Sequence, residues 1–285
     1  MSEIQILLPD VPPFIMHVHE TGCPWLSDVI RQTGAFEPFE SKVFARLLDT
    51  PVDVYDVGAN IGWYSLIAAS KLNGRGLVRA FEPCAQNFDL LAHNVAKNEF
   101  ANVHIHSVAL GRETGKSNLY LSKDNPGDHR AYLSNEQRER TSIEVLRFDS
   151  IFDLQSELPS VVKIDTQGFE VDVILGMGDL FYSPPQEMIL LIEFWPYGLT
   201  QRGERVDDFL KIIADAGYRV AVMVEADPYL RHTSFEALSN ASRRDLSPEG
   251  KGFVNLVLYR SLNGVGASLK NYFADGASPW VPDSW

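Results

Sequence analysis

The chain is poor in cysteine and in basic residues. Cys23 and Cys84 are its 2 cysteines, too few and too far apart for a disulfide framework or a thiolate metal site. Lys and Arg total 25 against 38 for Asp and Glu, which gives a formal net charge of −13. Binding to phosphate-rich surfaces depends on clustered cations. We therefore expect no nucleic-acid partner and no affinity for an anionic membrane.

Long apolar runs are also missing. The longest, at 188–192, is far shorter than the roughly 20 residues of a membrane helix. The first residues, Met-Ser-Glu-Ile-Gln, do not follow the basic and then apolar pattern of a signal peptide. With the low cysteine content, these features predict a soluble, cytoplasmic protein without a membrane partner.

The most informative stretch that is present spans residues 52–62. Residues 52–57 alternate β-branched or aromatic side chains with acids, and Gly58, Asn60 and Gly62 follow. Glycine lets a backbone turn sharply and approach a ligand without interference from a Cβ atom. The pattern predicts a buried strand, a glycine loop and a helix N-terminus, which together form a corner that can bind a nucleotide.

Strands and helices alternate along the rest of the chain and predict one α/β domain. We expect further strands at 76–81, 103–106, 117–122, 141–148, 161–165, 188–192, 218–224 and 253–259, and helices at 37–48, after residues 62, 83 and 169, and at 205–216. A polar loop between 122 and 141 is long enough to act as a lid or substrate loop.

The expected organisation has three parts. Residues 1–50 form an N-terminal arm, irregular up to residue 35, and a helix that packs on the core; residues 51–262 form the ligand-binding domain. Residues 263–285 form a tail whose aromatic side chains dock on the core or on a second subunit, as in a homodimer. In the arm, we interpret His17 and His19 as outward residues of a short strand, since two ligands without a third make no metal site.

Several acids lie where strands are expected to end or helices to begin. Glu82 follows the second strand at about the distance from the glycine loop where dinucleotide folds place a carboxylate for ribose hydroxyls. Asp165, Gln167 and Glu170 follow the strand at 161–165, at the edge where open α/β sheets bind ligands. The helix at 37–48 begins with Glu37 and Glu40, which could face the glycine loop, although acids also favour a helix N-terminus.

The glycine loop differs from that of dinucleotide-binding proteins. Those loops read Gly-x-Gly-x-x-Gly, whereas here Asp56 precedes Gly58 and Asn60. An acid at this position repels a pyrophosphate and attracts an ammonium or sulfonium group, so the ligand should combine adenosine with positive charge. A nicotinamide-dependent oxidoreductase is the first alternative, and a non-catalytic protein on the same scaffold is the second.

Five motifs in order resemble the FkbM family of S-adenosylmethionine-dependent methyltransferases. They lie between residues 37 and 193 and read Asp-x-Gly-Ala-Asn-x-Gly, Phe-Glu-Pro, Ala-Leu-Gly, Lys-Ile-Asp-x-x-Gly-x-Glu and Ile-Glu. The resemblance implies a Rossmann-like seven-stranded methyltransferase sheet, mostly parallel with an antiparallel last strand and helices on both faces. It also implies S-adenosyl-L-methionine as cofactor and O-methylation of a small-molecule acceptor, a sugar or natural product.

The resemblance also assigns residues. Those it implies for the cofactor are Asp56, Gly58, Ala59, Asn60, Gly62, Glu82, Pro83, Asn87, Ser107 and Val108. Asp165 would face the transferred methyl group, with Glu170 and Glu193 around the acceptor. Where the family's fourth motif more commonly reads Val-Glu-Gly, this chain has Thr-Gln-Gly at 166–168, so one acid is lost.

A base is needed to remove the acceptor's proton. His129 in the polar loop is the first candidate because imidazole titrates near neutral pH, with a plain surface histidine as the alternative. Asp165 is the second candidate, with helix capping or cofactor orientation as its alternatives. Lys163 lies on the same strand face and could keep Asp165 or Glu193 ionised. Trp195 and Tyr197 could stack on a sugar or fill the core edge.

Overall fold

The computed structural model describes residues 2–20, 23, 25–133, 136–151, 158–247, 252–273 and 280. Its centre is an eight-stranded sheet with the order β12-β11-β13-β10-β9-β3-β4-β5. The strands are β3 (Val54–Val57), β4 (Val78–Phe81), β5 (Val103–His106), β9 (Val161–Ile164), β10 (Ile189–Phe194), β11 (Arg219–Met223), β12 (Arg231–Thr233) and β13 (Val254–Tyr259).

The sheet confirms the predicted Rossmann-like α/β class. Strands β5, β4, β3, β9 and β10 run parallel, and β13 inserts antiparallel between β10 and β11. The last strand is therefore antiparallel, as expected. The short strand β12 adds an eighth, antiparallel strand at the edge.

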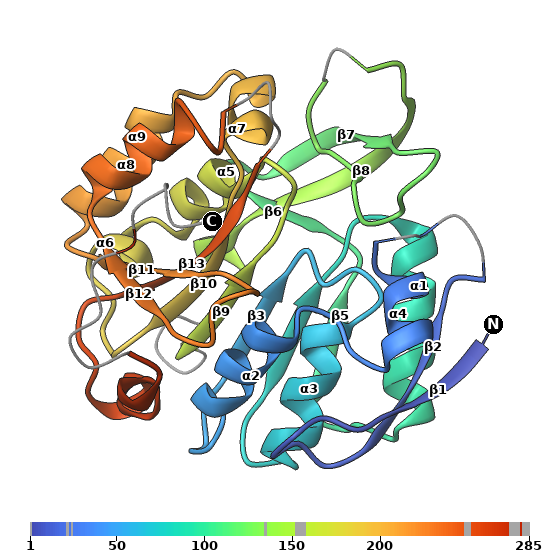
Figure 1. Cartoon of the computed structure of the whole chain (residues 1–285). Coiled ribbons are helices and arrows are strands. Elements are labelled where there is room, and N and C mark those ends of the chain that lie inside the picture. Colours follow the sequence, from blue (N-terminus) through green and yellow to red (C-terminus); the bar gives the residue numbers. More distant parts are fainter. Residues whose placement is uncertain are drawn as a thin grey trace.

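Helices cover both faces of this sheet (Figure 1). One face carries α2 (Pro38–Leu47), α3 (Trp63–Leu72) and α4 (Ala85–Lys97), and the other carries α5 (Glu170–Met177), α6 (Asp179–Tyr182), α8 (Val206–Asp215) and α9 (Phe235–Ser242). Alternate side chains of β3 join the two apolar clusters, Val54 on the first face and Tyr55 and Val57 on the second. This alternation follows from the two-residue period of a strand.

The predicted strands at 117–122 and 141–148 lie outside the central sheet. They are β7 (Gly115–Leu121) and β8 (Glu139–Arg147), which form a small sheet with β6 (Ala109–Gly111). The 3₁₀-helix η1 (Phe148–Ser150) follows β8. The small sheet packs beside α5 through β6. The loop between β7 and β8 lies at the ligand-binding edge of the central sheet.

The prediction of an irregular segment over residues 1–35 was wrong. Strands β1 (Ser2–Ile6) and β2 (Phe14–Val18) form an antiparallel hairpin, and α1 (Ser27–Thr33) follows. Side chains of α4 hold β2 in place, because Asn94 and Asn98 accept hydrogen bonds at 2.7 Å from the backbone N–H groups of His17 and Ile15. Pro9, Pro12 and Pro13 lie in the connection between the two strands, where proline does not interrupt strand pairing.

The prediction that His17 and His19 point outward was also wrong. Its side chain is buried, and its Nε2 lies 3.0 Å from Asn87 Oδ1 on α4. His17 packs edge-on against His93 of the same helix. Both rings thus face α4 because the hairpin packs along that helix.

The described residues of the C-terminal segment, 264–273 and 280, pack on the chain's own core. The 3₁₀-helix η2 (Gly264–Tyr272) places Tyr272 against Phe39, and the next residue, Phe273, stacks on His232. Trp280 is 4% exposed and joins the apolar cluster of the second face. The remaining predicted anchor, Trp285, lies outside the described residues. Among the helices described, none is long and apolar enough to span a bilayer.

Candidate active site

The loop between β3 and α3 packs directly against the end of β9. Gly58 has φ +84°, and a Cβ atom there would lie 1.9 Å from the backbone oxygen of Asp165. Gly62 precedes the first residue of α3 with φ +98°. Both positions use backbone conformations that favour glycine. The glycines therefore bring the loop against the edge of the sheet at Asp165.

Glu82 joins this loop to the start of α4. Its Oε2 accepts a hydrogen bond from the Asn60 N–H at 2.9 Å, and its Oε1 accepts one from the Cys84 N–H at 2.8 Å. Burial raises the pKa of Glu82 to about 7. Each carboxylate oxygen can accept a second bond, so Glu82 can still receive two hydroxyl groups.

A narrow cleft runs along these residues. Six of the ten predicted cofactor residues line it: Gly58, Asn60, Glu82, Pro83, Asn87 and Val108. Pro126, Gly127 and His129 of the β7–β8 loop line its other side. Asn87 holds this loop because its Nδ2 donates to the backbone oxygen of Pro126 at 2.9 Å.

The other predicted cofactor residues lie around this cleft. Asp56 and Ala59 line a second, wider cavity, and Gly62 caps α3. Asp56 is buried and accepts a 2.6 Å hydrogen bond from the Ser65 hydroxyl, and burial raises its pKa to about 6. Ser107 is exposed and is not part of the lining of the cleft, whereas its neighbour Val108 is.

The wide cavity has a volume of about 800 Å³. It shares Gly58, Asn60, Gly127, Asp165 and Gln167 with the narrow cleft, so the two adjoin at the end of β9. Its walls come from distant parts of the chain and include Trp25, Glu37, Glu193, Glu225 and Asn255. The lining thus extends from the segment before α1 to β13.

Lys163 lies beneath this cavity and is fully buried. Its Nζ is 3.0 Å from Glu40 Oε1 and 3.6 Å from Asp165 Oδ2, and it lies 5.0 Å from the centre of the Tyr64 ring. The expected contact with Asp165 is therefore present. Glu40 is the nearer partner, and its Oε2 also accepts a hydrogen bond from Asn255.

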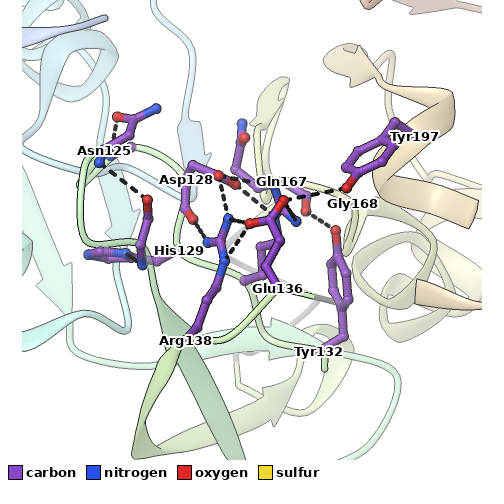
Figure 2. A network of polar contacts seen from close by, with 12 residues as sticks. Asn125, Asp128, His129, Tyr132, Glu136, Arg138, Gln167, Gly168 and Tyr197 are labelled. Atoms are coloured by element: carbon purple, nitrogen blue, oxygen red, sulfur yellow. Dashed lines mark hydrogen bonds and ion pairs between the residues drawn. The ribbon is translucent and has the colours of Figure 1, made fainter. Parts of the chain in front are cut away.

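Gln167 connects the two acids at the ends of β9 and β10. Its Nε2 donates to Asp165 Oδ1 at 2.9 Å and to Glu193 Oε2 at 3.2 Å. Its backbone has φ +55°, and its carbonyl oxygen accepts a 2.9 Å hydrogen bond from the Tyr132 hydroxyl (Figure 2). The residue that replaces the family's more common acid thus bridges two carboxylates.

Glu170 lies apart from these acids. Its Oε1 accepts hydrogen bonds from the backbone N–H groups of Thr166 and Gly168 at 3.0 and 3.1 Å. Burial raises its pKa to about 7. Both clefts are lined by other described residues, so Glu170 supports the turn between β9 and α5.

His129 is separated from the acids around Lys163. It lines the narrow cleft, and its Nδ1 accepts a hydrogen bond from the Ser122 N–H at 3.1 Å. Figure 2 shows its ring turned away from Gln167. Burial lowers the pKa of His129 to about 4. At neutral pH the ring is therefore uncharged and a weak base.

A charged network closes the other wall of the wide cavity. Arg130 binds Asp128 through two hydrogen bonds and lies over the rings of Trp195 and Tyr197, at 5.1 and 5.7 Å from their centres. Trp195 and Tyr197 stand at the start of α7 (Pro196–Arg202), which directly follows β10. Burial against an arginine makes these rings part of a packed wall.

Arg138 adds a second cation to this network. It contacts Asp128 Oδ2 and Glu136 Oε2, each at 2.6 Å (Figure 2). The loop between β7 and β8 is therefore held together by ion pairs between its own residues.

Among the described residues, no group of three His, Cys, Asp or Glu side chains is arranged to hold a metal ion.

The narrow cleft lies where the sequence analysis expects the adenosyl group of the implied cofactor. Asn60 Oδ1 is buried at the junction of the cleft and the cavity and has no hydrogen-bond partner among the described residues. A buried acceptor without a partner is costly and is commonly satisfied by a ligand or water. Together with the two open acceptor sites of Glu82, it offers a polar ligand three places to donate.

The chain is similar in sequence to two known proteins. It is 24% identical over 146 residues to Methyltransferase 1 of Beauveria bassiana, a match that covers 44% of this chain and 58% of that protein. It is 27% identical over 230 residues to the AMB antimetabolite synthetase AmbE of Pseudomonas aeruginosa, covering 67% of this chain and 11% of that protein. The chain thus spans less than two thirds of either relative.

The chain also matches a solved structure and a family model. The structure of methyltransferase FkbM from Methylobacillus flagellatus matches with 17% identity and a TM-score of 0.44, covering 74% of this chain and 44% of that one. The model of the FkbM methyltransferase domain matches residues 56–220, more than half of the chain. The chain belongs to the FkbM methyltransferase family, whose cofactor is S-adenosyl-L-methionine.

Proposed function

We propose that the protein is an S-adenosylmethionine-dependent O-methyltransferase that methylates a hydroxyl group of a small molecule, of the sugar or natural-product class. The observation that carries this proposal is the position of Asp165. It lines both the narrow cleft and the wide cavity, so a carboxylate stands where a donor in one space would meet an acceptor in the other. Family membership argues against the nicotinamide-dependent alternative.

In this proposal the narrow cleft holds the adenosyl part of the donor. Glu82 accepts hydrogen bonds from the ribose hydroxyls, Asn60 Oδ1 accepts one further bond, and Pro83 and Val108 pack against the adenine. Asp56 and Ala59 face the methionine part from the wide cavity. The bound donor supplies a methyl group that its sulfonium already activates, so the protein has to position the acceptor and remove one proton.

Asp165 is the proposed base. Its side chain is 29% exposed, and its two oxygens are held by Gln167 at 2.9 Å and by Lys163 at 3.6 Å. Such contacts fix the carboxylate while leaving lone pairs for the proton of an acceptor hydroxyl. The geometry favours Asp165 over His129, which faces the narrow cleft and has a lowered pKa.

The wide cavity is the proposed acceptor site. Trp195 lines it beside Arg130, and Trp25 and Phe253 line it while remaining 70% and 51% exposed. Aromatic faces of this kind pack against sugar rings or other flat ligands. Enclosure between them would exclude water from the reacting atoms, and orientation of two reactants can supply about 7–11 kcal/mol.

A screen with methyl-labelled S-adenosylmethionine tests this function. Monosaccharides and hydroxylated aromatic compounds serve as acceptors, and products are separated and treated with alkali. We expect label in an alkali-stable methyl ether. Label in an alkali-labile ester or on nitrogen would contradict O-methylation of a hydroxyl, and absence of binding of the labelled donor would reject the methyltransferase function itself.

A further inference from the structure

Four carboxyl groups lie around the buried ammonium group of Lys163; three of them line the wide cavity, and the fourth, Glu40, contacts Lys163 without lining it. We name Glu37, Glu40, Lys163, Asp165 and Glu193 the Lys163 cluster. Lys163 contacts Glu40 and Asp165 directly, and Gln167 links Asp165 to Glu193. Glu37 accepts a 2.6 Å hydrogen bond from the hydroxyl of Tyr64, whose ring lies beside Lys163. If all four acids were ionised, three negative charges would have no cation in the cluster.

The surroundings of the cluster do not supply the missing cations. The other ionisable groups that act on it are acids or a tyrosine, from every element packed against it: Asp56 of β3, Tyr64 of α3, Glu170 of α5 and Glu225 after β11. Arg130 is the other basic side chain that lines the cavity, and it is paired with Asp128 and Glu136. The cavity wall therefore has a surplus of acid among the described residues.

Buried carboxylates without a counter-charge bind protons instead of remaining ionised. Glu40 is 0% exposed and Glu193 is 8% exposed. Burial raises the pKa of Glu40 to about 8, and burial with the neighbouring acids raises the pKa of Glu37 and of Glu193. At neutral pH the cluster thus holds protons that a cation entering the cavity could replace.

We propose that the Lys163 cluster distinguishes the charged methyl donor from its neutral product: the sulfonium of S-adenosylmethionine displaces a proton from the cluster into solvent, and the thioether of S-adenosylhomocysteine does not. The cluster is one wall of the donor and acceptor space, so the inference rests on the proposed function. It makes the cluster a specificity-determining element that favours release of the product.

The proposal fixes how affinity depends on pH. A ligand that displaces a proton binds more tightly as pH rises, because fewer protons remain to be removed. The affinity for S-adenosylmethionine should therefore increase by up to about tenfold per pH unit below the pKa of Glu40, about 8, and level off above it. The affinity for S-adenosylhomocysteine should not follow this slope.

Calorimetric titration in two buffers of different ionisation enthalpy counts the protons released. Both ligands are titrated at pH about 6.5, where their α-amino groups remain protonated. S-adenosylhomocysteine shares every ionisable group of the donor and is therefore the matched ligand. We expect S-adenosylmethionine to release about one proton more than S-adenosylhomocysteine.

Variants locate the source of the proton. Glu37→Gln, Glu40→Gln and Glu193→Gln should each lower the proton release that accompanies S-adenosylmethionine binding. Glu136→Gln is the control because Glu136 lines the same cavity but is paired with Arg138. It should leave the proton release unchanged. An unchanged affinity for S-adenosylhomocysteine in each variant verifies that the site is folded.

The outcomes test the inference, its assignment to the Lys163 cluster and the proposed function separately. Equal proton release by both ligands in the wild-type protein would overturn this inference and leave the donor site standing. Extra release that survives in Glu37→Gln, Glu40→Gln and Glu193→Gln alike would overturn the assignment to the cluster. If neither ligand binds the wild-type protein, the proposed function fails, and the inference fails with it.

Discussion

The narrow cleft and the wide cavity adjoin, yet the chain builds them differently. One side of the cleft comes from short segments at the ends of consecutive strands, at 57–60, 82–87 and 108–110, and the rest comes mainly from the β7–β8 loop and the end of β9. The cavity combines Trp25, Glu37, Lys163, Glu193 and Asn255, which are far apart in sequence. Local motifs therefore place one side of the cleft, whereas the cavity exists only after the whole sheet has assembled.

The two spaces also balance charge differently. In the cleft, two backbone N–H groups donate to Glu82, although burial still raises its pKa to about 7. In the cavity, four acids share the single ammonium of Lys163, and burial raises the pKa of Glu37, Glu40 and Glu193. A neutral adenosyl group matches the first arrangement and a cation matches the second, which suits the two ends of one donor molecule.

Asp165→Asn should produce the largest effect, since Asp165 belongs to both spaces. Loss of a general base typically lowers turnover by about 10²–10⁴-fold. Asparagine keeps the shape, so affinity for S-adenosylhomocysteine should stay nearly constant. Turnover is measured with the acceptor identified by the labelled-donor screen. Turnover within about threefold of wild type would remove Asp165 as the base.

Glu82→Ala should weaken donor binding and leave the wide cavity intact. Hydrogen bonds to a charged group contribute about 1.5–3 kcal/mol each, so each ribose bond that is lost should reduce affinity for S-adenosylhomocysteine by roughly 10–100-fold. Calorimetry measures the affinity, and the thermal midpoint checks folding, because the Asn60 and Cys84 N–H groups lose their acceptor. Unchanged affinity would place the adenosyl group elsewhere.

Gly58→Ala tests how closely the cleft loop packs on β9. A left-handed backbone costs a residue with a Cβ atom about 1–2 kcal/mol, and the approach to the Asp165 oxygen at 1.9 Å adds an overpacking cost of about 1–3 kcal/mol. Gly34→Ala is the control, with φ +72° and no atom within 4 Å of its Cβ position. Urea unfolding should show the larger loss for Gly58→Ala; equal losses would contradict the close packing.

His129→Gln should have the smallest effect, on the pH dependence of stability. Burial lowers the pKa of His129 to about 4, so between that value and about 6.5 the unfolded chain binds a proton that the folded chain does not. Stability should therefore fall with decreasing pH, by at most about 1.4 kcal/mol per unit from this group. The variant should flatten that decline in urea unfolding, and an identical decline would contradict a buried neutral ring. Replacement of the exposed His104 is the control.

The sequence predicts more of the narrow cleft than of the wide cavity. Gly58, Asn60 and Glu82 lie together at one cleft, as local strand and loop signals suggested, and Val108, which the family resemblance assigned, lies beside them. The fold class followed from the same signals. The roles of these residues stay predictions until a ligand is measured.

Contacts between distant segments could not be predicted in the same way. The sequence suggested Asp165 or Glu193 as the partner of Lys163, but Glu40 of α2 is the nearest acid. Its position in the first turn of a helix was equally explained by helix stability. The contact depends on how α2 packs over the end of β9, which no local spacing reveals.

The side-chain directions of His129 and Glu170 could not be predicted from local spacing either. The composition of the β7–β8 loop made His129 a reasonable base, but loop conformation decides which of the two adjoining spaces it faces. Glu170 followed a motif at the correct strand end, yet the tight turn at Gln167 and Gly168 directs its carboxylate to backbone N–H groups. Turn geometry in both cases determines the direction of the side chain.

A crystal structure of the protein with S-adenosylhomocysteine would show whether the donor lies in the narrow cleft with its sulfur at Asp165. We expect the adenosine between Glu82 and Val108 under Pro126 and Gly127, with ribose oxygens within hydrogen-bond distance of Glu82 and the sulfur directed toward Asp165. Adenosine bound in the wide cavity, or a sulfur that faces away from Asp165, would contradict this placement.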